Sequence, residues 1–146
     1  MVEIMPLYLI TVTVLFITFA CSTSQEDLDN LTIYEVAKLI EQEIGDAKAE
    51  SVESCDFMPI GVKPAGGPWG YIVFSTDHSD KNRLESLVEK YNELDALRNE
   101  GENGFSTADF ATEPDIVVEN GACKGVGLYT WNPGDIINQA GLSDEN

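Results

Sequence analysis

The feature that most constrains this chain is an uncharged apolar run, from Ile4 to Ala20, which ends at Cys21. A run of this length is at the lower limit for crossing a bilayer and long for the core of a signal peptide. Under either interpretation, the first twenty residues take no part in the core of a domain. The rest of the chain is then tethered outside the cytoplasmic membrane, where cysteines oxidise.

The junction after the apolar run, ITFAC at residues 17–21, places a small residue directly before the cysteine. It resembles the lipobox of bacterial lipoproteins, whose cysteine is acylated and becomes the N-terminus after cleavage. The resemblance implies a signal peptide over residues 1–20 and a bilayer anchor on Cys21. Thr18 departs from the favoured leucine, and the leader carries Glu3 but no Lys or Arg. The alternative is an uncleaved membrane anchor with Cys21 unmodified.

Residues 21–31 are polar and acidic, with too few apolar groups to fold, so we expect a lipidated tether. Ser22 stands where enteric lipoproteins that stay in the inner membrane have aspartate. The run QED at 25–27 is similar to the acidic export signals of Bacteroidetes-type lipoproteins. These similarities imply an outer-membrane anchor in the cell envelope, with the domain in the periplasm or exposed at the cell surface.

The charge of the chain limits the classes of partner that it can bind. The formal net charge is −18, and Glu3 is the only charged residue before Cys21, so the part after the leader keeps −17. A field of this sign repels nucleic acid and anionic lipid, and we expect no nucleic-acid partner. The same charge can attract basic proteins or divalent cations, or it can simply keep a tethered protein soluble.

Setting Cys21 aside as the lipid site leaves one cysteine pair, Cys55 and Cys123. In an oxidising compartment an even pair is expected to form a disulfide, here enclosing nearly all of the globular part. The alternative is a reactive thiol, which needs a nearby cation or histidine to stabilise its thiolate. The only histidine, His78, lies on a different segment.

Two segments show apolar residues at helical spacing. In residues 32–47 the apolar groups recur every three or four positions, and Thr32 with Glu35 forms a capping-box pattern. Residues 80–100 carry the clearest apolar stripe of the chain. We expect two amphipathic helices that lie on a sheet.

The strands are expected between and after these helices. Residues 55–62 suggest an edge strand, and residues 69–76 are apolar on both faces, as in a covered strand. Asn120 and Gly121 suit a type I′ turn between two further strands. The predicted fold class is α+β, with a small antiparallel sheet of about four strands (two strands, then a helix, then a C-terminal hairpin) and two helices packed on one face. We expect a single domain over residues 32–131 and an acidic C-terminal tail over 132–146.

The loop GVKPAGGPW, residues 61–69, carries a family resemblance together with SCDFMPI before it and YIVFST, LVEKYNEL, FSTAD and NGACKG after it. These segments, within residues 44–124, resemble a group of bacterial lipoproteins of unassigned activity whose loop reads K-P-C-G-G-P-W. The resemblance implies that Ala65 and Ala108 replace a pair of cysteines. If they replace a lost disulfide, their Cα atoms should lie about 4.4–6.8 Å apart.

Two interpretations of this loop remain open. In the first, Gly66 and Gly67 shape a structural corner, Pro68 stiffens it and Trp69 caps the core. In the second, Trp69 and Tyr71 form a partly exposed aromatic platform for a sugar or a protein.

The sequence holds no recognisable nucleophile elbow, phosphate loop, zinc spacing or calcium loop, and we expect no cofactor or metal. Histidine, aspartate and serine gather only in TDHSD at residues 76–80, which suits a helix cap. We therefore expect an anchored, non-enzymatic binding or interaction protein of the envelope, with a protein or glycan partner. The alternative is a small envelope hydrolase or metal-dependent enzyme that uses His78 and nearby carboxylates.

Overall fold

The computed structural model describes residues 28–101 and 107–142. The predicted signal peptide, Cys21 and most of the tether lie outside the described residues. Short 3-10 helices occur at Leu28–Asn30 and Val52–Ser54, and the main elements are α1 (Ile33–Ile44), β1 (Cys55–Ile60), β2 (Gly70–Ser75), α2 (Lys81–Gly101), β3 (Asp115–Glu119), β4 (Ala122–Val126), β5 (Thr130–Trp131) and α3 (Ile136–Gln139).

Side-chain caps that the sequence predicts occur at the start of both long helices. The backbone N–H of Glu35 donates to the Thr32 hydroxyl over 3.3 Å, and the N–H of Thr32 donates to the Glu35 carboxylate over 2.8 Å. This is the predicted capping box, and it satisfies N–H groups that the first helical turn leaves free. At α2, the Asp80 carboxylate accepts the N–H groups of Asn82 and Arg83 over 3.0 and 3.1 Å.

The strands form two sheets. β1 and β2 are antiparallel, β5 joins the other edge of β2 in parallel, and β3 with β4 forms a separate hairpin around Asn120 and Gly121. Both turn residues have positive φ, as the predicted turn requires. The α+β class is confirmed, but the hairpin is not part of the β1–β2 sheet, because β5 occupies the edge of β2.

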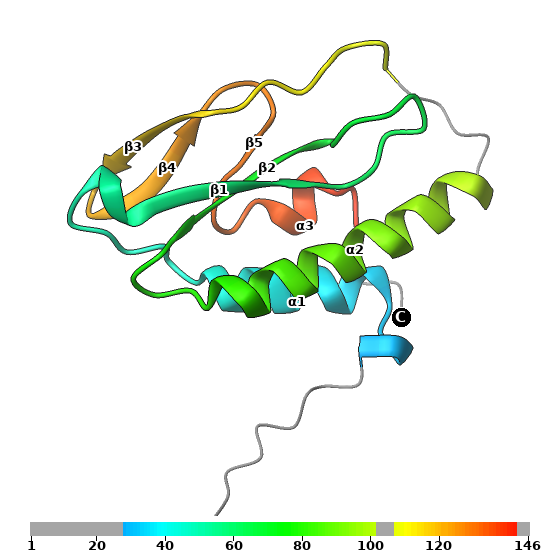
Figure 1. Ribbon diagram of the computed structural model, residues 1–146, viewed down its shortest axis with the longest axis horizontal. Coiled ribbons are helices and arrows are strands. Elements are labelled where there is room, and N and C mark those ends of the chain that lie inside the picture. Colours follow the sequence, from blue (N-terminus) through cyan, green and yellow to red (C-terminus); the bar gives the residue numbers. More distant parts are fainter. Residues whose placement is uncertain (1–27, 102–106, 143–146) are drawn as a thin grey trace, which may run out of the picture.

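The hairpin instead packs over the face of β2, close to Val73. A side chain at Gly125 would place its Cβ 2.8 Å from Val73 Cγ2, so the missing side chain lets β4 approach the sheet. Neighbouring residues of a strand point to opposite faces, so Ile72 and Phe74 point toward the helices. All three are fully buried, which confirms that β2 is covered on both faces. Figure 1 shows α1 and α2 together on one side of the sheet, as expected, and the hairpin on the other.

A disulfide joins the two sheets. Cys55 at the start of β1 pairs with Cys123 in β4, with a Cα–Cα distance of 5.6 Å and a sequence separation of 68. The predicted pairing is confirmed. The bond therefore fixes the β3–β4 hairpin to the three-stranded sheet at one point.

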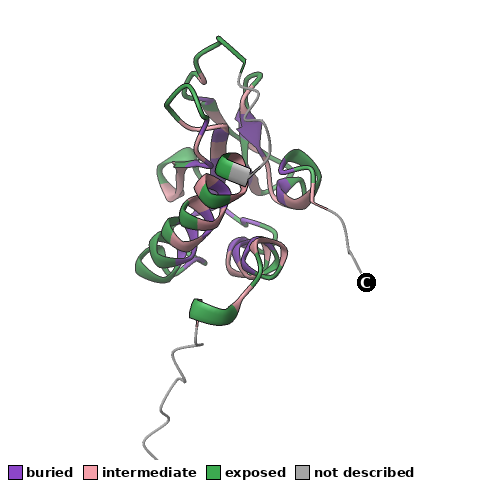
Figure 2. Cartoon of the chain, turned by 90° about the vertical axis from the view of Figure 1, so that its right-hand side faces the viewer, coloured by how far each residue is buried: buried purple, intermediate pink, exposed green. Residues whose placement is uncertain are grey.

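The segment assigned by sequence to a tail packs against the domain as far as residue 142. Ile136 of α3 is fully buried, and the N–H of Ile137 donates to the Glu41 carboxylate on α1 over 3.2 Å. Figure 2 shows the buried residues gathered where helices and strands face one another, with exposed residues on the outer sides. No helix within the described ranges is long and apolar enough to cross a membrane.

Candidate functional site

The loop between β1 and β2 is held by a polar row on α2. The N–H of Gly61 donates to Asn92 over 2.6 Å, and the N–H of Val62 donates to Asp95 over 2.9 Å. The Asn99 amide donates to the carbonyl of Val62 over 2.6 Å. These side chains therefore supply the hydrogen bonds that this buried backbone segment needs.

The rest of the loop closes on itself. The N–H of Lys63 donates to the carbonyl of Gly67 and the N–H of Gly66 donates to the carbonyl of Lys63, each over 2.8 Å. Gly66 and Gly67 have φ values of 97° and 82°, which side chains rarely adopt. The loop is thus a closed corner, and it delivers Trp69 half-buried at the start of β2.

The side chain of Lys63 is buried at the centre of this corner, which is unusual for a lysine. Its side chain is 3% exposed, and its ammonium donates to the backbone carbonyl of Asp109 over 2.9 Å. The Asp109 carboxylate lies 3.4 Å away. The same ammonium lies 5.4 Å from the ring centroid of Trp69 and 5.2 Å from that of Tyr129, which is cation–π range.

Asp109 completes this group. Its carboxylate accepts hydrogen bonds from the hydroxyls of Thr107 and Tyr129, and these bonds hold the pKa of Asp109 well below its usual range. The same hydrogen bond raises the pKa of Tyr129, because Asp109 disfavours a second negative charge beside it. Asp109 is therefore charged and Tyr129 neutral at neutral pH.

Beside this group lies a cavity of about 320 Å³, which we call the aromatic pocket. Its wall contains both tryptophans of the chain and two tyrosines, with a basic and an amide side chain and an exposed leucine: Trp69, Tyr91, Tyr129, Trp131, Arg98, Gln139 and Leu128. A cavity lined by aromatic side chains together with a few polar groups is a common form of a small-ligand site.

Two glycines make room for the two tryptophans. A side chain at Gly61 would place its Cβ 2.5 Å from Trp69 Cδ1, and one at Gly70 would place it 2.3 Å from Trp131 Nε1. Both distances are far shorter than any contact that real Cβ atoms make. The indole rings therefore lie directly against bare backbone, which fixes two walls of the pocket.

Two polar atoms of the pocket residues lack partners. Trp69 Nε1 and the Tyr91 hydroxyl are buried and have no hydrogen-bond partner within the described part of the chain. Burial, together with the negative charge of Asp95, raises the pKa of Tyr91, so its hydroxyl remains protonated. A buried polar atom without a partner costs about 1–3 kcal/mol, and both atoms are enclosed by the protein behind the pocket wall.

Arg98 lies at the same pocket, with its charge already balanced. Its guanidinium donates to the fully buried Asp95 carboxylate over 2.8 Å and to the carbonyl of Ala140 over 3.4 Å. Asp95 thus connects the loop and Arg98 in one network, since it also accepts the N–H of Val62.

The two predicted platform residues, Trp69 and Tyr71, make different contacts in the structure. Trp69 lines the aromatic pocket, whereas Tyr71 packs edge-on against Phe57, with centroids 5.7 Å apart and planes at 83°.

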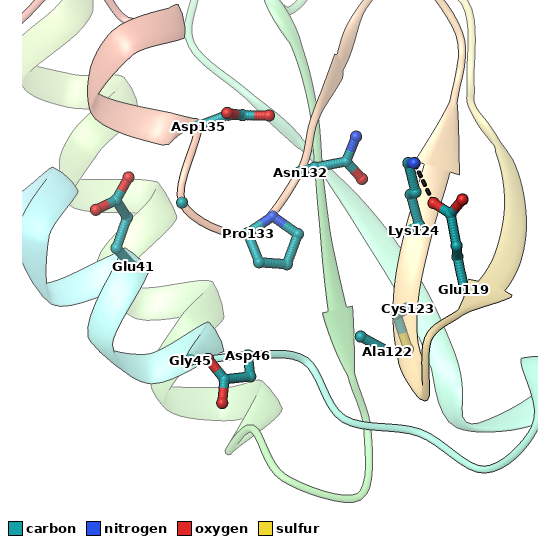
Figure 3. Close-up of a pocket in the computed structure, with 11 residues that line it drawn as sticks. Glu41, Gly45, Asp46, Glu119, Ala122, Cys123, Lys124, Asn132, Pro133 and Asp135 are labelled. Atoms are coloured by element: carbon teal, nitrogen blue, oxygen red, sulfur yellow. Dashed lines mark hydrogen bonds and ion pairs between the residues drawn. The ribbon is translucent and has the colours of Figure 1, made fainter.

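A second cavity, of about 630 Å³, lies between α1, the hairpin and the segment before α3. Figure 3 shows the carboxylates of Glu41, Asp46 and Asp135 spread around it, and Glu119 paired with Lys124. No group of three or more potential metal ligands occurs among the described residues. This acidic cavity therefore has no feature that points to a particular ligand.

His78 is exposed and lines an open cavity of about 1090 Å³. Asp46, Glu50 and Asp77 line the same cavity. None of the described carboxylates lies within 4.0 Å of its ring nitrogens. The nearby Asp80 caps α2, as the sequence predicted. The arrangement expected of a hydrolase, with a carboxylate from another segment bonded to His78, is not formed within the described ranges.

Sequence reasoning missed most of the pocket. The sequence patterns assign no role in a site to Lys63, Tyr129 or Trp131. One signal was present: Asn92, Asp95 and Asn99 recur at helical spacing and mark a polar face on α2 that needs a partner.

Comparison with known proteins adds no assignment: no family model, no curated protein and no solved structure matches the chain. The resemblance to the lipoprotein group therefore remains a prediction. The contact of Lys63 with Asp109 places the loop beside the segment that carries Ala108.

Proposed function

We propose that this chain is a lipid-anchored binding protein of the bacterial cell envelope, and that it works without catalysis. The aromatic pocket is where it holds its ligand. The lipobox-like junction at residues 17–21 and the acidic tether support the anchor. The observation that carries the binding role is the pocket itself, with two indole rings and two tyrosines among the residues that line it.

The alternative enzymatic function has less support. General acid–base work by His78 requires a carboxylate or a reacting group within hydrogen-bond reach. The described carboxylates near His78 share its concave surface but make no ion pair with it. The aromatic pocket likewise has no nucleophile beside a base among its lining residues.

The anchor is tested by the intact mass of the protein extracted from membranes, before and after reduction and alkylation. We expect the mass of residues 21–146 plus three acyl chains, and two alkylations that appear only after reduction. A mass that begins at residue 1 would contradict the lipid anchor.

The binding role is tested by tryptophan fluorescence, because Trp69 and Trp131 are the only tryptophans and both line the pocket. The full chain is titrated with the low-molecular-weight fraction of hydrolysed envelopes. We expect a saturable change that Leu128→Glu abolishes, since Leu128 is 85% exposed and lines the pocket. The matched control is Leu97→Glu, an exposed leucine that does not line the pocket. Equal responses from the two variants would contradict the proposal.

A further inference from the structure

We propose that the outer edge of β3 is a docking site for an extended basic segment of a partner protein, which adds to the β3–β4 hairpin as a third strand. No residue of β3 lines the aromatic pocket, so this inference goes beyond the proposed function and does not depend on it. Two sets of observations lead to it: the hydrogen bonds at the edges of the two sheets, and the charges along β3.

The two sheets together present four outer edges, on β1, β5, β4 and β3. On β1, Pro59 has no N–H, and the N–H of Phe57 already donates to the Asp56 carboxylate over 2.8 Å. β5 has only two residues, too few to pair with another strand. Proteins close sheet edges by such means, because an open edge pairs with other chains.

The outer edge of β4 is covered by other segments of the chain. The N–H of Cys123 donates to the carbonyl of Ala47 over 2.8 Å. The Asn132 side chain takes the place of a strand: its oxygen accepts the N–H of Gly125 over 2.8 Å, and its nitrogen donates to the carbonyl of Gly125 over 3.2 Å. The backbone groups of Cys123 and Gly125 therefore point away from β3.

The outer edge of β3 is open. Val118 lies opposite Cys123 in the antiparallel ladder, and Ile116 lies opposite Gly125. Opposite residues direct their backbone groups either toward each other or both away, so the N–H and C=O groups of Ile116 and Val118 point outward. None of these four groups has a hydrogen-bond partner within residues 28–101 and 107–142. Figure 1 shows β3 at the margin of the fold, with β4 between it and β5.

The side chains of β3 select the segment that fits, since main-chain groups alone bind any extended strand. Asp115, Val117 and Glu119 alternate on its exposed face. Asp115 makes no ion pair within the described part of the chain, and Glu119 pairs with Lys124 on β4. Opposite charges across a ladder stabilise it, so the complementary segment is basic, apolar and basic at alternate positions.

A cavity at one end of the edge adds further acidic groups. Val118 and Asn120 line the cavity of about 1090 Å³, and its wall also contains Asp46, Glu50 and Asp77 against a single lysine. These carboxylates extend the negative field past the end of β3. A partner segment that continues beyond the strand therefore favours basic residues there as well.

A second copy of this chain is a poor occupant of the same edge. If two β3 strands paired about a twofold axis at Val117, all the outward groups would bond, but Asp115 would twice lie opposite Glu119 of the second copy. Like charges directly opposite each other destabilise a ladder. The strong negative charge of each copy adds to this repulsion.

The open edge is tested first by amide hydrogen exchange of the full chain in detergent, followed by NMR. We expect the amides of Ile116 and Val118 to exchange fast, and that of Val117, which points toward β4, to exchange more slowly. Equal protection of the three amides in the free chain would show that the edge is closed and would overturn the inference.

Binding is measured with a labelled peptide, Gly-Lys-Val-Val-Val-Lys-Gly, which sets a lysine beside each acid of β3 and a valine beside Val117. We expect saturable binding that protects the amides of Ile116 and Val118 from exchange. The same peptide with glutamate in place of both lysines should bind about tenfold more weakly. No binding of the lysine peptide, or equal binding of the two, would refute the docking site.

Two methylated forms of the lysine peptide test whether main-chain bonds hold it. One carries N-methyl groups on the first and third valines, and the other on the middle valine. Alternate residues of a strand direct their N–H groups to opposite sides, so only one form loses its bonds to β3. We expect one form to bind and the other not to bind, and equal binding by both would contradict strand addition.

The decisive variant is Asp115→Lys, because Asp115 is exposed and its replacement leaves the fold intact. We expect the lysine peptide to bind this variant about three- to tenfold more weakly, and the glutamate peptide to bind it more tightly by a similar factor. The matched control, Glu89→Lys, makes the same change of charge at an exposed position of α2, across the fold from the hairpin, and leaves both affinities unchanged at physiological salt. Equal responses of the two variants would show that net charge alone attracts the peptide, and would overturn the inference.

Discussion

The ammonium group of Lys63 lies 2.9 Å from the backbone carbonyl oxygen of Asp109, which follows it by 46 residues along the chain. This contact ties the corner loop to the segment before β3. It also places one cation against the rings of Trp69 and Tyr129, two walls of the aromatic pocket. Lys63 is therefore a positioning residue for the pocket.

Substitution of Lys63 tests this role. We expect Lys63→Met to lower the free energy of unfolding by about 1–3 kcal/mol, because it removes a buried hydrogen bond and two ring contacts. The near-UV circular dichroism of the tryptophans should weaken at the same time. The control is Lys48→Met, whose side chain is 70% exposed. A Lys63→Met protein as stable as this control would contradict the role.

The Asp109 group predicts a dependence of stability on pH. Its carboxylate has a pKa below the ordinary value of about 4 in the folded chain and near that value in the unfolded chain, so the folded state binds fewer protons. Its contribution is complete above about pH 4 and is lost as the pH falls through the folded-state pKa.

The measurement compares urea unfolding of wild type and Asp109→Asn between pH 7 and acid. We expect the wild type to be more stable at pH 7 and the difference to shrink below about pH 4. A difference that does not change with pH would show that the Asp109 charge adds nothing.

Loss of the disulfide should lower the stability of the fold strongly, because the bond joins two cysteines that are far apart in the sequence. In the chain-entropy model, loss of Cys55–Cys123 costs about 4 kcal/mol, because the bond closes a long loop. We expect the double variant Cys55→Ser/Cys123→Ser to unfold at correspondingly lower denaturant. Reduction of the wild type should give the same shift, which separates loss of the bond from the effects of the serines.

Gly70 lies against the indole ring of Trp131, so a side chain at this position should clash with the ring. Gly70→Ala should cost about 1–3 kcal/mol and change the near-UV spectrum, because its Cβ would lie 2.3 Å from Trp131 Nε1. Gly66→Ala, with nothing within 4 Å, should cost about 1–2 kcal/mol through its positive φ alone and leave the spectrum unchanged. Identical spectra for the two variants would contradict this account of the pocket wall.

The family resemblance predicts a second disulfide. In the double variant Ala65→Cys/Ala108→Cys we expect a bond to form spontaneously under oxidising conditions, without loss of stability. Mass after alkylation shows it, and the single variant Ala65→Cys is the control. Two thiols that remain free in the double variant would remove the support for the resemblance.

What the sequence predicts here is what short segments determine. The capping box of Thr32 and Glu35, the turn at Asn120 and the covered strand over residues 70–75 follow from neighbours in the chain. The disulfide follows from counting: one pair remained once Cys21 was set aside.

What the sequence does not predict depends on distant contacts. β5 has only two residues, Thr130 and Trp131, so no periodicity reveals a parallel strand. The pocket is assembled from the loop, α2, β5 and α3, and a lysine such as Lys63 has no local mark of burial. Its position follows only once Asp109 and the two aromatic rings are brought around it.

The central claim is that the aromatic pocket holds a ligand in the cell envelope. Native mass spectrometry of the full chain released gently from membranes tests it most directly. The account predicts a non-covalent small-molecule adduct on the wild type and on Leu97→Glu, and none on Leu128→Glu. An adduct that persists on Leu128→Glu, or a wild-type protein without any adduct, would contradict it.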